Sequence, residues 1–197
     1  MISVNGNVAA LVCKDVVELA HQAEATLEVN LFHREANREK AIKKLLEDAG
    51  ATNVLGIGEE SSATIPEISS ERRRVDPKGI LKADLVFVPL EDGDRTETLT
   101  KMGKKVVTVD LNPLSRTARS ASITIVDNIV RAVPLLVGET RRLKVASRKL
   151  LESVVSDFNN MENIGRTLGF ISKRLAEISG NTNIGVSDVS EITTMVK

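Results

Sequence analysis

The sequence predicts an α/β fold, a three-layer sandwich with a mostly parallel β-sheet and helices at its C-terminal end. Short apolar runs rich in β-branched residues alternate along the chain with amphipathic helical patterns, which is the arrangement of βαβ units. One of these runs, 83–89, is apolar almost throughout, as in a strand that is buried on both faces of a parallel sheet. Right-handed crossovers should then place helices on both faces of the sheet.

The first half of the chain contains three expected strands, at 1–4, 26–30 and 53–57. A helix over 8–20 follows from apolar residues that recur at helical spacing. A second amphipathic helix is expected over 34–49, because Gly50 supplies a typical helix end.

The second half continues the alternation. After the strand at 83–89, a short helix is expected to end at Met102, and strands are expected at 106–109 and 123–126. From Asn128 the pattern is helical to about Phe158, with Pro134 tolerated only near the first turns.

A last helix has apolar residues at alternating spacings of four and three, which resembles a heptad seam. This stripe, and a second one in the preceding helix, are expected to pack on each other or across a dimer axis; they are Ile164, Leu168, Ile171, Leu175 and Ile178, and Leu143, Ala146, Leu150 and Val154. We expect a single domain over 1–180 and a loose tail over 181–197, where periodicity is weak.

The segment 58–79 is long for a connection inside a compact domain, and such segments are usually lids or mobile loops. It contains three consecutive arginines, Arg72 to Arg74. We interpret them as a solvated or substrate-gating loop.

The composition excludes several classes of function. Lys and Arg number 27 and Asp and Glu also number 27, so the chain lacks the positive charge that binding to nucleic acid or to an anionic membrane needs. The only aromatic residues are four Phe, too few for nucleic-acid stacking. No apolar run is long enough to span a bilayer. The single cysteine, Cys13, forms no internal disulfide, which indicates a reduced, cytoplasmic setting.

Common catalytic and cofactor motifs are also missing. There is no Walker-type phosphate loop, no nucleophile elbow and no zinc-protease motif. Gly56-Ile57-Gly58 follows a strand but lacks a third glycine, so an NAD-dependent oxidoreductase is disfavoured. His21 is interpreted as a surface or packing residue.

Polar groups gather after the two strands of the stretch 105–132. Asp110 ends the first strand, Arg116 and Arg119 lie in the polar loop that follows, and Asp127-Asn128 ends the second strand at a helix start. In open α/β sheets, ligands bind outside the carboxyl ends of the strands. A carboxylate beside cations and free N–H donors suits the ribose and phosphates of a nucleotide.

Several longer motifs in the same order resemble one family, the archaeal 4-phosphopantoate–β-alanine ligases, also called phosphopantothenate synthetases. The motifs are VNGN at 4–7, EVNLFHR at 28–34, PLEDGDRTE at 89–97, DLNPLSRTA at 110–118 and ITIVDNI at 123–129. The resemblance runs from residue 1 to about residue 178. It implies a Rossmann-like homodimer that condenses 4-phosphopantoate with β-alanine, converts ATP to AMP and diphosphate, and supplies coenzyme A biosynthesis. It also implies a further helical segment ahead of the first strand.

The same resemblance assigns ATP contacts to seven residues: Asp110, Leu111, Asn112, Arg116, Thr117, Asn128 and Ile129. Their chemistry agrees, because carboxylate and amide groups suit ribose or base, arginine and hydroxyl groups suit phosphate, and a helix start has free N–H groups. From the residues alone, an equal alternative is that Asp110 to Pro113 is a structural turn and Asn128 only a helix cap.

For the reaction, His33, Arg34 and Arg95 are candidates to bind the 4-phosphate or the transferred oxygens. The alternative is that Arg34 and Arg95 are solvated charges in the first turns of helices. Mg²⁺ is expected on the diphosphate, with no metal held by protein ligands. Asn5-Gly6-Asn7 is a strand-to-helix turn whose amides suit an anion, or a plain connection.

A second class of function stays open beside the ligase. The chain is alternatively a non-catalytic Rossmann-like module for nucleotide binding or dimerisation. Release of AMP that depends on both the acid and the amine distinguishes the two.

Overall fold

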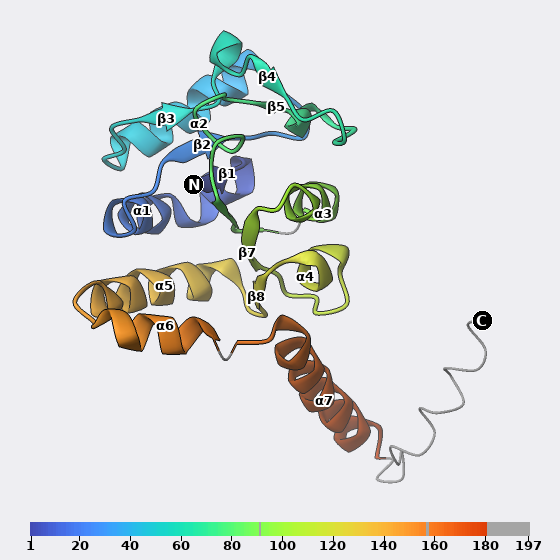
Figure 1. Cartoon of the computed structure of the whole chain (residues 1–197). Helices are drawn as coiled ribbons and strands as arrows, with labels where there is room; N and C mark the ends of the chain where they lie inside the picture. The colour runs from blue at the N-terminus through green and yellow to red at the C-terminus, as the bar shows by residue number, and fades with distance from the viewer. Residues whose placement is uncertain (91, 157, 181–197) are drawn as a thin grey trace.

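The structure is a computed structural model that describes residues 1–90, 92–156 and 158–180 (Figure 1). The tail predicted for 181–197 lies outside the described residues. No helix in the described ranges is long and apolar enough to cross a membrane.

A sheet of six strands forms the middle layer, in the order β3-β2-β1-β6-β7-β8. Every neighbouring pair in it is parallel, which confirms the predicted fold class. The strands are β1 (Ile2–Val4), β2 (Leu27–Val29), β3 (Val54–Leu55), β6 (Leu85–Val88), β7 (Lys105–Val109) and β8 (Ile123–Ile125).

Helices cover both faces of this sheet. On one face, α1 (Gly6–Gln22), α2 (Ala36–Asp48) and α5 (Ile129–Lys144) share a core cluster with residues of β1, β2 and β3. On the other face, α3 (Gly93–Lys101) and α4 (Arg116–Ser120) pack against each other and against β7. In Figure 1 the two groups of helices lie on opposite sides of the strands, which gives the predicted three layers.

The position of β6 in the middle of the sheet explains why its sequence is apolar. Phe87 packs into the core cluster shared with α1 and α5, whereas Val86 and Val88 pack into the cluster on the opposite face. Successive side chains of a strand point to opposite faces of the sheet. When helices cover both faces, the side chains on each face must therefore be apolar.

The segment expected as a long loop over 58–79 has structure of its own. It contains an antiparallel pair of strands, β4 (Ala63–Thr64) and β5 (Arg74–Val75), with one short helical turn before β4 (Gly58–Glu60) and a second between the two strands (Glu71–Arg73). Its apolar residues are buried in the core cluster on the second face, namely Ile65, Ile68 and Val75, with Ile80 just beyond. The segment is thus a packed part of the fold that covers the sheet beside α3.

The prediction of one helix from Asn128 to about Phe158 is wrong, because the structure has two helices there. Helix α5 ends at Lys144 and α6 (Arg148–Ser156) begins after a short turn. Ser147 accounts for the new start, since its hydroxyl accepts the backbone N–H of Leu150 at 3.3 Å. The loop expected between β7 and β8 likewise contains the short helix α4.

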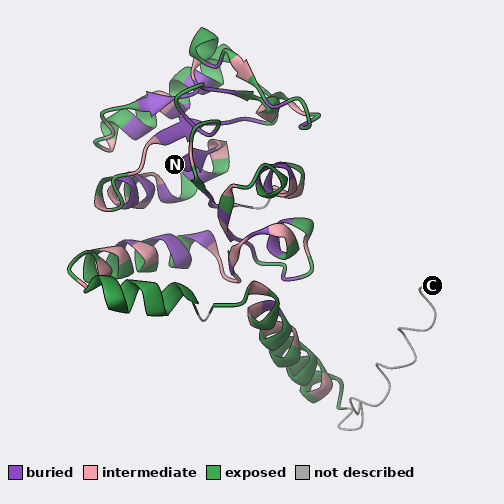
Figure 2. Cartoon of the chain, in the orientation of Figure 1, coloured by how far each residue is buried: buried purple, intermediate pink, exposed green. Residues whose placement is uncertain are grey.

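The two predicted C-terminal stripes do not pack on each other. In α6 no residue is buried, and in α7 (Asn160–Ser179) only Ile164 is buried (Figure 2). Leu150, Val154, Leu175 and Ile178 are exposed. The C-terminal half of α7 extends away from the rest of the molecule in Figure 1.

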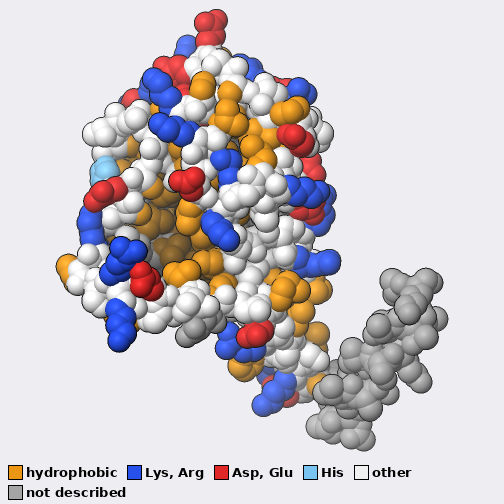
Figure 3. Space-filling view, in the orientation of Figure 1, with side chains coloured by type: hydrophobic (Ala, Val, Ile, Leu, Met, Phe, Trp, Pro, Cys, Tyr) orange, Lys and Arg blue, Asp and Glu red, His pale blue; other side chains and the backbone are white. Residues whose placement is uncertain are grey.

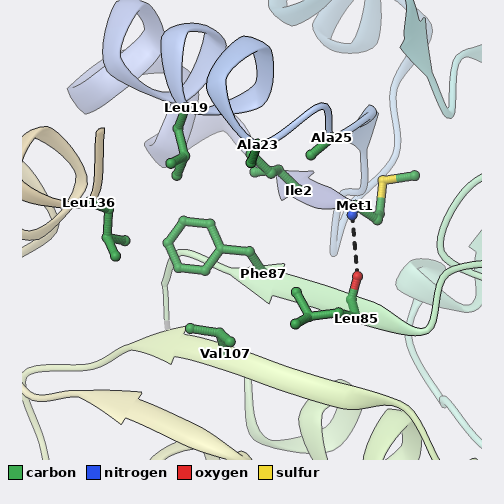
Figure 4. A pocket seen from close by; sticks show the side chains of 9 residues that line it. All are labelled: Met1, Ile2, Leu19, Ala23, Ala25, Leu85, Phe87, Val107 and Leu136. Atoms are coloured by element: carbon green, nitrogen blue, oxygen red, sulfur yellow. Dashed lines mark hydrogen bonds between the residues drawn. The ribbon is translucent and has the colours of Figure 1, made fainter. Parts of the chain in front are cut away.

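A small apolar recess of 170 Å³ lies at the amino ends of β1 and β6, the edge opposite the predicted site. Phe87, Leu19 and Leu136 point into it, and the Met1 amino group donates to the carbonyl of Leu85 at 3.2 Å (Figure 4). Figure 3 shows hydrophobic side chains at the floor of this recess, between α1 and α5.

Candidate active site

The carboxyl ends of the strands meet at one edge of the sheet, and the order of the strands reverses there between β1 and β6. Such a switch point leaves a crevice in which α/β proteins bind ligands. Two cavities open along this edge. We call them the β7–β8 hollow and the β6–β7 crevice.

The β7–β8 hollow has a volume of 320 Å³. It brings together four of the seven residues predicted to contact ATP, namely Asp110, Leu111, Asn128 and Ile129. The other lining residues are Leu11, Leu90, Val109 and Asp127, so its wall is largely apolar with a few carboxylate and amide groups. A mostly apolar pocket with a few placed polar groups is the usual form of a small-molecule site.

The β6–β7 crevice is larger, with a volume of 620 Å³. It contains two more of the predicted residues, Asn112 and Arg116. The rest of its lining was not predicted as a site: Phe32, Ser69, Arg72, Asp92, Gly93, Asp94 and Ser115. Two arginines and two aspartates face one cavity, so it offers both guanidinium donors and carboxylate acceptors to a polar ligand.

Asp110 shapes the loop between the two cavities. It is buried at the end of β7, and its carboxylate accepts the backbone N–H of Asn112 at 2.8 Å and the hydroxyl of Ser115. Asn112 in turn accepts the N–H of Leu114 at 3.0 Å. The turn that the alternative interpretation assigned to Asp110 to Pro113 is therefore present, and it presents the same residues to the cavities.

Asn128 likewise has the cap contact that the alternative interpretation assigned to it. Its side-chain oxygen accepts the N–H of Val130 at 3.1 Å at the start of α5. Ile129, the first residue of α5, is buried and lines the hollow with Asn128. The positive end of a helix dipole thus opens beside the β7–β8 hollow.

Arg116 and Thr117 follow each other in α4 but lie in different surroundings. Arg116 is exposed and pairs with Asp94 at 2.9 Å and with Glu97 at 3.0 Å; these hydrogen bonds raise its pKa. Thr117 is fully buried, and its hydroxyl accepts the backbone N–H of Asp92 at 2.9 Å. Arg116 therefore faces the crevice, whereas Thr117 lines neither cavity.

Arg95 is the centre of a buried polar network below the crevice. Its side chain is 2% exposed and donates to Ser3 at 2.6 Å and to Asn30 at 2.7 Å. Its Nε lies 2.8 Å from a carboxylate oxygen of Asp92, an ion pair in which that N–H does not point at the oxygen. Burial lowers the pKa of Arg95, and Asp92 opposes this by favouring the charged form.

Arg34 is also buried, with 4% of its side chain exposed. It pairs with Glu39 at 2.6 Å and donates to three groups of the segment after β3, the carbonyls of Gly56 and Arg74 and the hydroxyl of Ser61. The interpretation of Arg34 and Arg95 as solvated charges is therefore wrong. His33 is exposed and stacks edge-on against Phe32, with 4.7 Å between the ring centroids.

The three predicted reaction residues are thus placed outside the two cavities. His33, Arg34 and Arg95 line neither one. Within the described parts of the chain, no three His, Cys, Asp or Glu side chains gather into a possible metal site.

Residues 1–174 match the family model described as phosphopantothenate/pantothenate synthetase. The chain belongs to this family. A relative in Thermococcus kodakarensis, named 4-phosphopantoate–β-alanine ligase, is 51% identical over 91% of this chain and 68% of its own length. Relatives with the same name in Thermococcus onnurineus and Methanosarcina mazei are 49% and 43% identical, over 91% and 92% of this chain and 68% and 71% of their own lengths.

The region shared with the phosphopantothenate synthetase family includes every strand of the sheet and both cavities. Two cavity residues that sequence reasoning missed had a signal in the sequence. Asp92 lies in the motif PLEDGDRTE but was interpreted only as helix-cap chemistry, and Arg72 lies in the arginine triplet that was interpreted as a loop. Phe32 lies in the motif EVNLFHR and Ser115 in DLNPLSRTA, but neither was assigned a role; for Ser69 no such signal exists, because only the fold brings it to the crevice.

Proposed function

We propose that this chain catalyses the ATP-dependent condensation of (R)-4-phosphopantoate with β-alanine, which gives 4'-phosphopantothenate, AMP and diphosphate for coenzyme A biosynthesis. The observation that carries the proposal is the pair of adjoining cavities at the switch point of the sheet, in a chain of the phosphopantothenate synthetase family. Residues 1–180 would act as one domain. Both substrates are those in the name of the relatives, 4-phosphopantoate–β-alanine ligase.

We place the nucleoside of ATP in the β7–β8 hollow. Asp110 and Asn128 there offer oxygen acceptors to the ribose or base, and Leu111 and Ile129 offer apolar contact. The phosphates would extend toward Asn112 and Arg116 in the neighbouring crevice. Thr117 supports this arrangement from behind, through its bond to the backbone of Asp92.

In the first step, a carboxylate oxygen of 4-phosphopantoate attacks the α-phosphorus of ATP. A new C–O–P linkage forms, the bond to the β-phosphate oxygen breaks, and diphosphate leaves. The amine of β-alanine then attacks the acyl carbon, so that the amide forms, AMP leaves and the amine releases a proton. Positioning and charge stabilisation account for most of the acceleration in such reactions.

Arg116 is the cation that we assign to the reacting phosphates. Its present partners, Asp94 and Glu97, are exposed or half-exposed, and exposed ion pairs contribute little stability. The guanidinium can therefore exchange a carboxylate for a phosphate at small cost. Mg²⁺ on the diphosphate would neutralise the leaving group, held by phosphate oxygens.

In this proposal Arg34, Arg95 and His33 do not touch the substrates but support residues that line the crevice. Arg95 and Arg34 are occupied by protein partners, so we assign them to positioning the wall of the crevice. His33 flanks Phe32, which lines the crevice.

We further propose that the chain acts as a homodimer in the cytoplasm. Ile171, Leu175 and Ile178 leave an apolar face on α7 that a second copy would cover. ATP and a single unpaired thiol, Cys13, suit a reducing compartment.

The test is an assay for AMP and for the mass of 4'-phosphopantothenate, with the purified chain, ATP, Mg²⁺, 4-phosphopantoate and β-alanine. Reactions that omit each component in turn are the controls. Product and AMP that require every component support the ligase. ATP binding without AMP release would instead favour a non-catalytic nucleotide-binding module.

Arg116→Ala tests the placement of ATP. We expect its dissociation constant for ATP, measured by calorimetry, to rise on the order of tenfold, since one charge-assisted contact is lost. Arg119→Ala is the matched control, because Arg119 is exposed in the same helix and lines neither cavity. Equal affinity in both variants would remove Arg116 from the site.

A further inference from the structure

The β6–β7 crevice has an arginine near each of its two sides. Arg116 enters from α4, after β7, together with Asn112. Arg72 enters from the segment that crosses the other side of β6, together with Phe32 from the exit of β2. The sheet order places β2 and β7 on opposite sides of β6, so the two arginines approach from opposite directions.

Arg72 is held at the wall of the crevice with little freedom. Its side chain is only 12% exposed and is paired with Asp92. The Asn30 side chain donates to the backbone carbonyls of Arg72 at 3.1 Å and Arg74 at 3.3 Å. Arg95 fixes both Asn30 and Asp92 from below. A cation placed in this way loses little conformational entropy when it binds an anion.

The positive charge of this wall is not balanced by Asp92 alone. One carboxylate oxygen of Asp92 serves both Arg72 and Arg95. The Nε of Arg72 is buried and makes no hydrogen bond to any described residue. Of the other nearby acids, Asp94 pairs with Arg116, and Glu28 lies next to Arg95 and accepts the backbone N–H groups of Asp76 and Ile80. Its Nη1 bonds Asp92 and its Nε is too buried to meet a ligand, but its Nη2 bonds no described residue, so Arg72 has a donor and charge left for a ligand.

The donors around Arg72 suit a phosphate. The carboxylate of Asp92 makes no capping bond to α3 and turns to the arginines instead, so the N–H groups of the first turn of α3 stay open beside Gly93. Ser69 adds a hydroxyl at the same wall, which donates to Asp94 at 3.2 Å and would have to exchange that carboxylate for the phosphate. A guanidinium, a hydroxyl and helix N–H groups together provide more donors than the two oxygens of a carboxylate need. The oxygens of a phosphate match this set better.

We propose that Arg72 binds the phosphate of 4-phosphopantoate and sets the preference of the enzyme for the phosphorylated acid. This rests on the proposed function. The substrate then spans the crevice past Asp92 and Gly93, with its carboxylate toward Arg116 and ATP and its phosphate on Arg72. Arg95 and Asp92 are positioning residues for that contact.

The experiment compares Arg72→Ala with Arg73→Ala in the full chain. Arg73 is the neighbouring arginine, is exposed and lines neither cavity, so it is the matched control. Calorimetric titration measures the binding of 4-phosphopantoate and, separately, of ATP and of pantoate, the same acid without its phosphate. Initial rates give KM and kcat for both acids, and thermal unfolding checks that each variant is folded.

We expect Arg72→Ala to weaken binding of 4-phosphopantoate on the order of 10- to 100-fold, with an equal rise in KM, and to leave ATP affinity and pantoate binding unchanged. Arg73→Ala should match the parent chain. Arg72→Lys keeps a partner for Asp92 and should fall between the two, which provides the comparison if the alanine variant is unstable.

Weaker ATP binding in Arg72→Ala, or unchanged binding of 4-phosphopantoate, would overturn the assignment. A parent chain that binds neither 4-phosphopantoate nor ATP would overturn the proposed function as well. A parent chain that binds 4-phosphopantoate without turnover would contradict the ligase alone, and the titrations would still decide the role of Arg72.

Discussion

Arg95 shows how one residue can organise an edge of the sheet without touching a ligand. It joins Ser3 of β1, Asn30 after β2 and Asp92 after β6, so three strand ends depend on one guanidinium. Buried charges of this kind are costly unless every partner is present. We infer that this network fixes the relative positions of the strand ends at the switch point.

Arg95→Met should therefore destabilise the fold strongly. The free energy of unfolding should fall by about 3 kcal/mol, because Asn30 and Ser3 lose a buried donor and Asp92 loses one of its two cations. Urea unfolding followed by circular dichroism measures the loss. Arg116→Met is the control, since its ion pairs are exposed and should contribute less than about 1 kcal/mol. Similar losses in both variants would contradict a structural role for Arg95.

Glu28 is a second buried charged residue, and unlike Arg95 it was assigned no role from the sequence. It is fully buried in β2 and accepts the N–H groups of Ile80 at 2.6 Å and Asp76 at 3.2 Å. Burial raises the pKa of Glu28 to about 7, while these N–H groups and Arg95 lower it and the Asp76 charge raises it further. The folded chain therefore binds more protons than the unfolded chain between about pH 4.5 and 7.

Because the folded state holds the extra proton, the Glu28 contribution to stability is greatest at low pH and decreases as the pH rises to about 7. Glu28→Gln removes this decrease. The difference in unfolding free energy between the parent and this variant should shift by on the order of 3 kcal/mol between pH 4.5 and 8. Glu59→Gln, at an exposed position, is the control. A difference that is constant with pH would show that Glu28 titrates normally.

At the scale of elements, Gly56 explains a motif that resembled part of a dinucleotide fingerprint. It follows β3 with a φ of +82°, and a Cβ atom there would lie 2.4 Å from the carbonyl oxygen of Val29. Gly58 also has a positive φ, of +55°, but a Cβ atom there would meet nothing within 4 Å. Gly56 thus allows β3 and β2 to approach, which is a packing role.

Gly56→Ala and Gly58→Ala separate the two effects. Both substitutions place alanine at a positive φ, which costs about 1 kcal/mol. Only Gly56→Ala adds a clash with backbone, so its loss of unfolding free energy should exceed that of Gly58→Ala by about 2 kcal/mol. Denaturant titrations of the two variants give the comparison. Equal losses would mean that the strands can move apart without penalty.

The elements that the sequence analysis placed best are the strands and the amphipathic helices. β6 and α1 were predicted because apolar periodicity follows directly from which faces are covered. The break at Ser147 and the short helix α4 were missed, since a single cap bond or a five-residue helix leaves almost no periodic signal. The 58–79 segment was missed as structure because its strands are only two residues long.

At the scale of the whole molecule, α7 is the feature that the described chain leaves without a cover. Ile164 and its neighbours attach the start of the helix to α4 and β8, while Phe170, Leu175 and Ile178 stay exposed further along. Figure 3 shows hydrophobic side chains on the surface of the extended helix. The predicted heptad stripe is thus partly used within the chain and partly available to a second copy.

Leu175→Asp tests the proposed homodimer. A charge in the middle of an apolar contact between copies should abolish association, and light scattering after gel filtration should report the mass of one chain. Lys173→Asp lies about 200° around the same helix and should leave the dimer intact. A parent chain that is monomeric at micromolar concentration would refute the dimer. So would a Leu175→Asp variant that remains dimeric.

The sequence by itself determined the fold class and the family, and it predicted four of the eight residues that line the hollow we assign to the nucleoside. These depend on local patterns and on contiguous motifs such as the one from Asp110 to Thr117, which folds into a turn followed by the start of α4. Only the tertiary structure decided that Arg95 is a buried support, that Arg72 is a wall of the crevice and that Gly56 is a strand contact. Those roles arise from residues 20 to 92 positions apart, such as Arg72 with Asp92 and Arg95 with Ser3. Periodicity reports which face of an element is covered, whereas the particular partner of a polar side chain depends on how distant strands are ordered in the sheet.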